Sequence, residues 1–152
     1  MCTYVDEKAT EAYRNKIKGK TGYAWKVIEI DSSGKFYSPF INSKIHKKRN
    51  VIKRLKRAYL SSGQRFFTFE GQRFFTGGVF HLCTTRAGAR KMKRWLDPYS
   101  CLESIKIARV SFSPASLVCV GSSVPSDKEA FGLAAGPDSI CVHAYNIERL
   151  VR

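Results

Sequence analysis

The chain lacks several features that would define its class at once. It has no apolar run near the ~20 residues that a membrane-spanning helix requires, and its first residues hold no apolar stretch like that of a signal peptide. Its five cysteines are an odd number without a C-x-x-C pair, which argues against a disulfide framework or a zinc knuckle. We therefore expect reduced thiols in a single cytoplasmic domain spanning residues 1–152.

Metal-binding and phosphate-binding motifs are missing as well. None of the three histidines, His46, His81 and His143, has a second ligand at metal-binding spacing. The phosphate loop G-x-x-x-x-G-K is absent. Cys2 would become an N-terminal nucleophile if Met1 were removed, although no sequence feature places a histidine beside it. The sequence thus predicts no metal and no cofactor.

Acidic residues are nearly missing from the middle of the chain. Residues 32–96 hold sixteen Lys or Arg and a single acidic residue, Glu70, so this segment accounts for the net charge of +15. The two flanking segments are close to neutral. A charge block of one sign indicates a polyanionic partner, because a surface that serves solubility alone mixes both signs.

Two basic groups lie within this block. One is the run KIHKKRNVIKRLKR at 44–57, and the other is an expected helix at 86–96. Arg65 and Arg73 each precede two phenylalanines and could add stacking beside charge, although a hairpin would bury half of these rings in a core. Phosphate contacts from such groups supply affinity without sequence information. The candidate ligand-binding residues are Lys44, Lys47, Lys48, Arg49, Lys53, Arg54, Lys56, Arg57, Arg65, Arg73, Arg86, Arg90 and Arg94.

Hydrophobic periodicity predicts an α+β fold with a mostly antiparallel sheet and two or three short helices. The expected helices and their caps are 7–18 with Asp6, 51–60 with Asn50, and 86–96 with Thr84 or Thr85. In the last helix, Ala89, Met92 and Leu96 are expected to face inward. The expected strands are 23–30, 35–40, 79–83, 105–112, 117–120 and 140–151.

Two further segments have a distinctive composition. The sequence G-Q-R-F-F-T occurs at 63–68 and again at 71–76, and this echo with Glu70-Gly71 between the copies predicts a β-hairpin. Residues 121–137 are rich in Gly, Ser, Pro and Ala and predict a long loop, which in a compact domain is more often functional or mobile.

The order of motifs resembles a loose set of short, uncharacterised phage and bacterial proteins that begin Met-Cys. They have a strand like 23–27, a Ser-Pro-aromatic step like 38–40, and a Gly-x-x-His segment like 78–81 that leads into a helix. The resemblance covers most of the chain and implies a mobile-element origin, with the host cytoplasm as its location, but it implies no particular activity.

A second similarity is to the arginine–serine–glutamate branch of the ADP-ribosyltransferase fold. Residues 80–85 (FHLCTT) stand where that family has an aromatic residue before a Ser-Thr-Ser step, and Glu148 lies on a late strand like the catalytic glutamate. Lys26 replaces the expected Arg or His and lacks the guanidinium fork that grips a pyrophosphate, and Asn146 replaces the first acid of Glu-x-Glu. The similarity implies a degenerate fold with catalytic roles for Lys26, Thr84 and Glu148 on a dinucleotide.

Three functions remain open. The first is a phage-type accessory protein that binds a nucleic acid or a nucleotide messenger without catalysis, with both basic groups lining one positive groove. The second is an ADP-ribosyltransferase-like enzyme. The third is an inhibitor that docks its basic face on a host protein, for instance in host-defence evasion. The charge distribution favours the first function, and an extended run of charge suits a nucleic acid better than a compact nucleotide.

Overall fold

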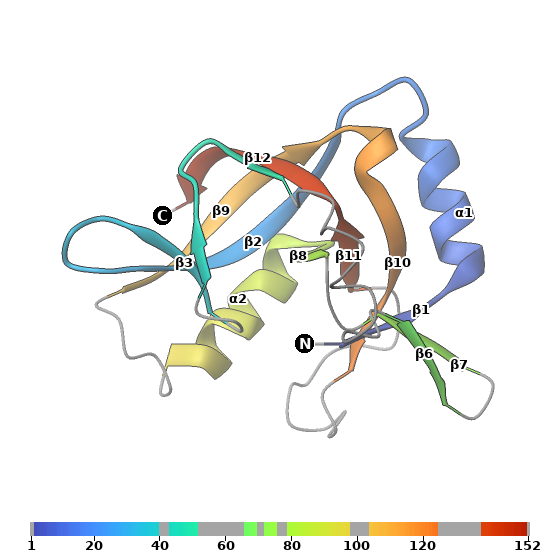
Figure 1. Cartoon of the computed structure of the whole chain (residues 1–152), viewed down its shortest axis with the longest axis horizontal. Coiled ribbons are helices and arrows are strands. Elements are labelled where there is room, and N and C mark those ends of the chain that lie inside the picture. Colours follow the sequence, from blue (N-terminus) through green and yellow to red (C-terminus); the bar gives the residue numbers. More distant parts are fainter. Residues whose placement is uncertain are drawn as a thin grey trace, which may run out of the picture.

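The computed structural model describes residues 2–39, 43–51, 66–69, 72–75, 79–97, 104–124 and 138–151. Within these residues the protein is α+β, as the sequence predicts, with two α-helices and a mostly antiparallel sheet (Figure 1). The helices are α1 (Glu7–Lys16) and α2 (Arg86–Leu96). The strands are β1 (Cys2–Val5), β2 (Gly22–Ile30), β3 (Phe36–Ser38), β4 (Ser43–Ile45), β5 (Arg49–Val51), β6 (Phe66–Phe69), β7 (Gln72–Phe75), β8 (Phe80–Cys83), β9 (Ser104–Phe112), β10 (Leu117–Val124), β11 (Ser139–Val142) and β12 (Ala144–Val151).

All of these strands belong to one sheet. Its order is β5-β12-β9-β2-β8-β11-β10-β1-β7-β6, and β3 and β4 extend from β2. The longest pairing joins β2 to β9 over nine residues, from Gly22 opposite Phe112 to Ile30 opposite Ser104. Because side chains alternate along a strand, β2 has two distinct faces. We call the face with Ala24 and Ile28 the core face, and the face with Trp25 and Val27 the helix face.

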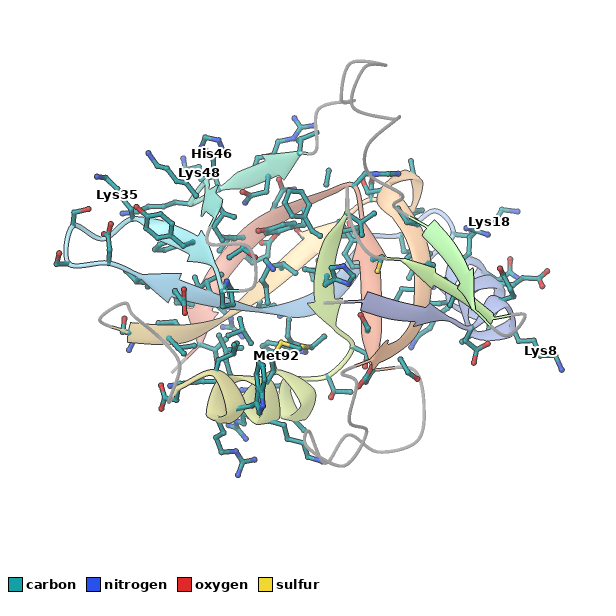
Figure 2. All side chains as sticks on the ribbon, turned by 60° about the horizontal axis from the view of Figure 1, so that its bottom comes forward. Lys8, Lys18, Lys35, His46, Lys48 and Met92 are labelled. Atoms are coloured by element: carbon teal, nitrogen blue, oxygen red, sulfur yellow. The ribbon has the colours of Figure 1, made fainter. Side chains whose placement is uncertain are left out.

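The helix face is covered in part by α2. Thr85 caps this helix, since its hydroxyl accepts the backbone N–H of Gly88 at 3.0 Å. Ala89, Met92 and Leu96 are buried, as the sequence predicts, and pack in one cluster that also holds Val27, Cys83 and Ile107. Figure 2 shows Met92 on the side of α2 that faces the sheet. The exposed cations of α2 lie on the opposite side of the helix.

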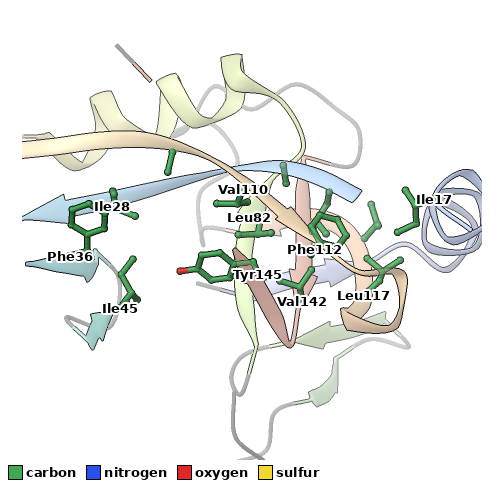
Figure 3. Packing of buried hydrophobic residues seen from close by; sticks show 14 residues of the cluster. Ile17, Ile28, Phe36, Ile45, Leu82, Val110, Phe112, Leu117, Val142 and Tyr145 are labelled. Atoms are coloured by element: carbon green, nitrogen blue, oxygen red, sulfur yellow. The ribbon is translucent and has the colours of Figure 1, made fainter. Parts of the chain in front are cut away.

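The core face carries the larger hydrophobic cluster. Phe36 and Ile45 pack with Ile28 at one end, and Ile17 and Phe112 lie at the other end beside α1 (Figure 3). The most deeply buried large side chains include that of Tyr145, whose ring meets Phe80 edge-on at 4.8 Å between ring centres. This cluster fixes β3 and β4 on the side of the β2–β9 pair that α2 does not cover.

The N-terminal strand and α1 complete the other end of the molecule (Figure 1). Asp6 caps α1 as predicted, because its carboxylate accepts the backbone N–H of Ala9 at 2.8 Å. The Thr10 hydroxyl accepts the N–H of Val120 at 2.9 Å and ties the helix to β10. β1, which the sequence analysis did not anticipate, pairs with both β10 and β7.

The two halves of the sheet meet at a narrow junction. β2 and β8 share one described residue pair, Trp25 opposite Cys83. Next to this pair, the buried Lys26 side chain donates from Nζ to the backbone carbonyl of His81 at 3.3 Å. The Lys26 side chain therefore provides a further hydrogen bond between β2 and β8 where their backbone pairing ends.

The expected hairpin is confirmed. Phe66 lies opposite Phe75 and Phe69 opposite Gln72, so β6 and β7 pair as the repeated motif predicts. The turn residues Glu70 and Gly71 between them lie outside the described residues.

Three predicted elements are wrong in part. Asn50 does not cap a helix but lies in β5, where its amide group accepts the N–H of His46 and donates to the His46 carbonyl. Residues 121–124 are not loop but the end of β10, because β1 offers them a pairing partner. The expected strand 140–151 is interrupted at His143, whose N–H donates to the Ser116 carbonyl at 2.8 Å. The remainder of the predicted helix, 52–60, and of the predicted loop, 125–137, lies outside the described residues.

Candidate nucleic-acid interface

Two aromatic side chains stand on the helix face of β2. Tyr23 and Trp25 are two residues apart and therefore point to the same side as Val27, the residue that packs on α2. Tyr23 is 49% exposed and, with Val51 and Leu150, is one of the large hydrophobic side chains that lie at the surface among the described residues. Trp25 is half-buried beside α2. The centre of the sheet thus presents aromatic rings next to a basic helix.

Each of these rings is accompanied by an arginine. The guanidinium carbon of Arg109 lies 4.5 Å from the centre of the Tyr23 ring. The guanidinium carbon of Arg86, at the start of α2, lies 6.0 Å from the ring of Trp25. Such cation–π contacts contribute about 0.5–1 kcal/mol each at exposed sites, so they hold the rings and the planar cations in place. We call these four residues the arginine–aromatic row.

The strand register extends this row across the sheet. Arg109 of β9 is opposite Trp25 on one side and opposite Arg149 of β12 on the other. Directly opposite residues project to the same face, so the two arginines and the tryptophan form one line across three strands. At strand spacings of about 4.8 Å, this line is roughly 10 Å long before α2 is added.

A second line lies beside the first. Ser111 is opposite Tyr23 on one side and opposite Asn146 on the other. The register of β12 shifts between Ile147 and Arg149, which leaves Glu148 as an extra residue. The Ser111 hydroxyl donates to Oε1 of Glu148. Ser111 is buried while Glu148 is exposed, so the fold fixes an accessible carboxylate next to the arginine–aromatic row.

The cations of α2 adjoin the row through Arg86. Arg90, Lys91 and Arg94 are exposed, and Lys93 is half-buried. The helix contains no acidic residue between Arg86 and Leu96. Three of the predicted ligand-binding residues, Arg86, Arg90 and Arg94, therefore lie on the same side of the sheet as Tyr23, Trp25 and Arg109, and Arg86 contacts the row directly.

The described part of the first basic group lies elsewhere. Lys44, Lys47, Lys48 and Arg49 are all exposed on β4, β5 and the segment between them. This segment is anchored by Ile45, which packs on the core face. Figure 2 shows Lys48 and His46 on the side of the molecule away from α2. The described members of the two basic groups therefore lie on opposite sides of the β2–β9 pair and do not line one groove.

Some of the predicted ligand-binding side chains are not among those that the structure describes. Lys53, Arg54, Lys56, Arg57 and Arg65 lie outside the described residues. Arg73 belongs to β7, of which the structure describes the backbone and not this side chain.

The three candidate catalytic residues do not gather at one point. Lys26 is 5% exposed and belongs to the core face, and burial lowers the pKa of its amine to about 8. Glu148 meets Ser111 on the helix face. Thr84 is half-buried just before the cap of α2, and its N–H donates to the Asp138 carbonyl at 2.9 Å. The body of the sheet thus separates Lys26 from Glu148.

A buried polar cluster lies under β1. The Thr3 hydroxyl is 2.9 Å from both Nδ1 of His81 and the Ser139 hydroxyl, and the Cys141 thiol is 3.5 Å from the same nitrogen. Burial, aided by the charge of Lys26, lowers the pKa of His81 to about 3. Hydrogen bonding to Cys119 and burial raise the pKa of Cys141. At neutral pH both side chains are uncharged, so this cluster serves as a hydrogen-bonded part of the core.

Sequence reasoning missed the arginine–aromatic row. The alternation of Tyr23, Trp25 and Val27 is visible in the sequence, but Arg109 lies in the later, nearly neutral third of the chain. Only the pairing of β2 with β9 brings it to Tyr23. The sequence offered one indication of an exposed aromatic surface. It is a strand in which aromatic residues alternate, with the first of them, Tyr23, next to Gly22.

Other site types find no support in the described part of the chain. No three His, Cys, Asp or Glu side chains there are close enough to hold a metal ion. The helices that are described include none with the length and apolar character needed to cross a membrane. No protein-family model, curated protein or solved structure matches the chain.

Proposed function

We propose that this protein binds nucleic acid without catalysis, through the helix face of the β2–β9–β12 strands and the exposed side of α2. The observation that carries the proposal is the alternation of guanidinium groups and aromatic rings, Arg86 on Trp25 and Arg109 on Tyr23. Cations beside stacking rings on an exposed sheet are typical of surfaces that hold nucleic-acid strands.

The charge of this surface supports a phosphate-rich partner. Arg90, Lys91 and Arg94 are exposed on a helix without acids, and Arg149 adds a further exposed cation at the other end of the line. Each phosphate that a cation neutralises releases condensed counterions, which makes binding depend on salt. The surface spans a helix and three strands, so it suits an extended polymer better than a compact nucleotide messenger.

The test is a charge reversal on α2. The double variant Arg90→Glu/Arg94→Glu should weaken binding of a fluorescein-labelled oligothymidylate of about 12 nucleotides by about tenfold or more. It should also reduce the slope of log affinity against log salt by about one to two, because about two phosphate contacts are lost. Fluorescence anisotropy over about 50–200 mM salt measures both quantities.

The matched control is Lys8→Glu/Lys18→Glu, which makes the same charge change at exposed residues on α1 and shortly after it, away from α2 (Figure 2). It should change affinity by less than about threefold. If both double variants weaken binding equally, the effect is one of net charge and the interface is wrong. If Lys47→Glu/Lys48→Glu alone abolishes binding, the polymer binds on the opposite side, at the first basic group.

An ADP-ribosyltransferase-like enzyme is the second candidate. It is supported by β8 running directly into α2 with Thr84 and Thr85 between them, the order of elements that this similarity implies. The positions of Lys26 and Glu148 on opposite faces favour the binding function. Consumption of a nicotinamide dinucleotide that is lost in Glu148→Gln would decide for the enzyme.

The third candidate is a phage-encoded accessory protein that acts as an inhibitor in the host cytoplasm. It would use the same charges to dock on an acidic host protein. A complex captured from host extract that survives nuclease treatment and moderate salt would favour it over the nucleic-acid proposal.

A further inference from the structure

We infer that Tyr23, Ser111 and Glu148 form a base-reading subsite that takes an unpaired guanine from a single strand. The inference rests on the proposed nucleic-acid function and adds to it the kind of strand and the base. It arises because a stacking ring and a fixed carboxylate lie side by side on one face of the sheet.

The ring selects for an unpaired base. Tyr23 is 49% exposed and is held by Arg109 at 4.5 Å, so it offers a surface on which a flat base can stack. In a duplex the faces of the bases are already covered by their neighbours. Stacking on a side chain therefore requires a single strand or a flipped base.

The carboxylate selects among the bases. A carboxylate has two oxygens and only accepts hydrogen bonds. The Ser111 hydroxyl donates to Oε1 of Glu148 and so fixes the exposed group. Each carboxylate oxygen can accept two hydrogen bonds, so both oxygens can still accept from a base. On their Watson–Crick edges, adenine and cytosine each offer a single donor next to an acceptor, and thymine has its one donor between two acceptors. Guanine alone has two adjacent donors, N1–H and the exocyclic N2 amine, which match the two oxygens of a carboxylate.

The spacing of the strands allows both contacts at once. Ser111 is directly opposite Tyr23, so the carboxylate bound to its hydroxyl lies roughly one strand spacing of about 4.8 Å from β2. A purine that stacks on Tyr23 and extends along this line brings its edge to Glu148. Arg109 and Arg149 of the neighbouring line then lie on the side where the phosphates of the same strand can pass.

The experiment compares oligothymidylates of about 12 nucleotides that carry one central guanine, adenine, cytosine or inosine. Binding to the wild-type protein is measured by fluorescence anisotropy at one salt concentration. We expect guanine to bind about five- to tenfold tighter than adenine or cytosine. Inosine lacks the N2 amine and should lose most of this advantage, whereas 7-deazaguanine keeps both donors and should retain it.

Two variants assign the effect to the named side chains. Glu148→Gln replaces one acceptor oxygen by a donor and should bring the ratio of guanine to adenine affinity close to one, while Glu11→Gln, an exposed change on α1, should leave that ratio intact. Tyr23→Leu should weaken binding to all the oligonucleotides about fivefold or more, and Tyr23→Phe should restore it.

The outcomes separate this inference from the proposed function. If the oligothymidylates bind in a salt-dependent manner but guanine gives no advantage, or if Glu148→Gln keeps the advantage, the guanine subsite is wrong and the nucleic-acid proposal stands. If a duplex of the same sequence competes as well as the single strand, the stacking role of Tyr23 is wrong. If no oligonucleotide binds, both proposals are wrong.

Discussion

Lys26 brings an ammonium group into the interior of the protein. Its amine meets the His81 carbonyl at 3.3 Å, and the described residues place no carboxylate in ion-pair contact with it. A buried charge without an opposite charge is costly because the protein interior solvates it poorly. Burial accordingly lowers the pKa of Lys26 from 10.5 to about 8.

The lowered pKa predicts how stability depends on pH. Between about pH 8 and 10.5 the unfolded chain holds a proton on Lys26 that the folded protein has lost, so this residue makes the protein more stable as the pH rises. Lys26→Met removes the buried charge and should raise the free energy of unfolding near pH 7 by about 1–3 kcal/mol. The gain should shrink towards pH 10, where the wild-type amine is itself neutral.

Urea unfolding of wild type and Lys26→Met at both pH values provides the measurement. Lys18→Met, at an exposed position, controls for the loss of one positive charge. A Lys26→Met protein that is less stable by the same amount at both pH values would mean that the bond to His81 outweighs the cost of the buried charge.

At the scale of elements, α2 performs two tasks at once. Its inner side fills a cluster with Val27, Cys83 and Ile107, and its outer side displays cations next to Trp25. The Thr85 cap sets where the helix begins, and Arg86, the residue that meets Trp25, follows it directly. The first turn of α2 is therefore also part of the proposed interface.

Loss of the cap should affect both tasks. Thr85→Ala leaves the N–H of Gly88 without its acceptor and should lower the free energy of unfolding by about 1 kcal/mol. It should also weaken oligothymidylate binding, since the first turn that holds Arg86 frays. Thr85→Ser keeps the hydroxyl and should retain both properties. Thermal unfolding and anisotropy are the measurements, and equal behaviour of the two variants would contradict the role of the cap.

Elements with strong local patterns could be predicted from the sequence. Helix α2 has a cap, an apolar stripe and a proline after it, and the hairpin β6–β7 has a repeated motif around a turn. The prediction that Asn50 caps a helix was wrong because a residue type that caps helices also closes tight loops through its side chain. Asn50 does so with the backbone of His46. The break at His143 depends on a hydrogen bond to Ser116, which no local pattern reveals.

The candidate site was predictable in its charge but not in its geometry. The cations of α2 follow from sequence composition and a helical period. Tyr23 and Arg109 are 86 positions apart in the numbering, and they meet only because β9 pairs with β2 in one particular register. A shift of that register by one residue would turn Arg109 to the core face.

For the molecule as a whole, the described cations of the two basic groups are divided between two sides of the sheet. A polyanion that binds the folded protein must stabilise it by mass action. Oligothymidylate at about a hundredfold excess over its dissociation constant should raise the midpoint of thermal unfolding by about 5–10 °C at low salt. The shift should vanish at high salt, where phosphate contacts are screened.

The unfolded chain is also basic and binds the polyanion to some extent, which makes this a stringent test of a folded interface. Arg90→Glu/Arg94→Glu should show a smaller shift than Lys8→Glu/Lys18→Glu, although both have the same net charge. Equal shifts would mean that the polyanion recognises charge without regard to the fold. Differential scanning fluorimetry suffices for the comparison.

The narrow junction between β2 and β8 has a consequence for the mechanics of the protein. Among the described residues, one residue pair joins β2, and with it β3, β4, β5, β9 and β12, to β8 and the other strands, so side-chain packing contributes much of what holds the two halves at their mutual angle. Lys26 reaches from β2 to β8, the Tyr145 ring of β12 meets Phe80 of β8, and Met92 packs with Val27 and Cys83 across the joint. We expect a change in the volume of the Cys83 or Met92 side chain to alter the angle between the two halves and to leave the strand pairings within each half intact.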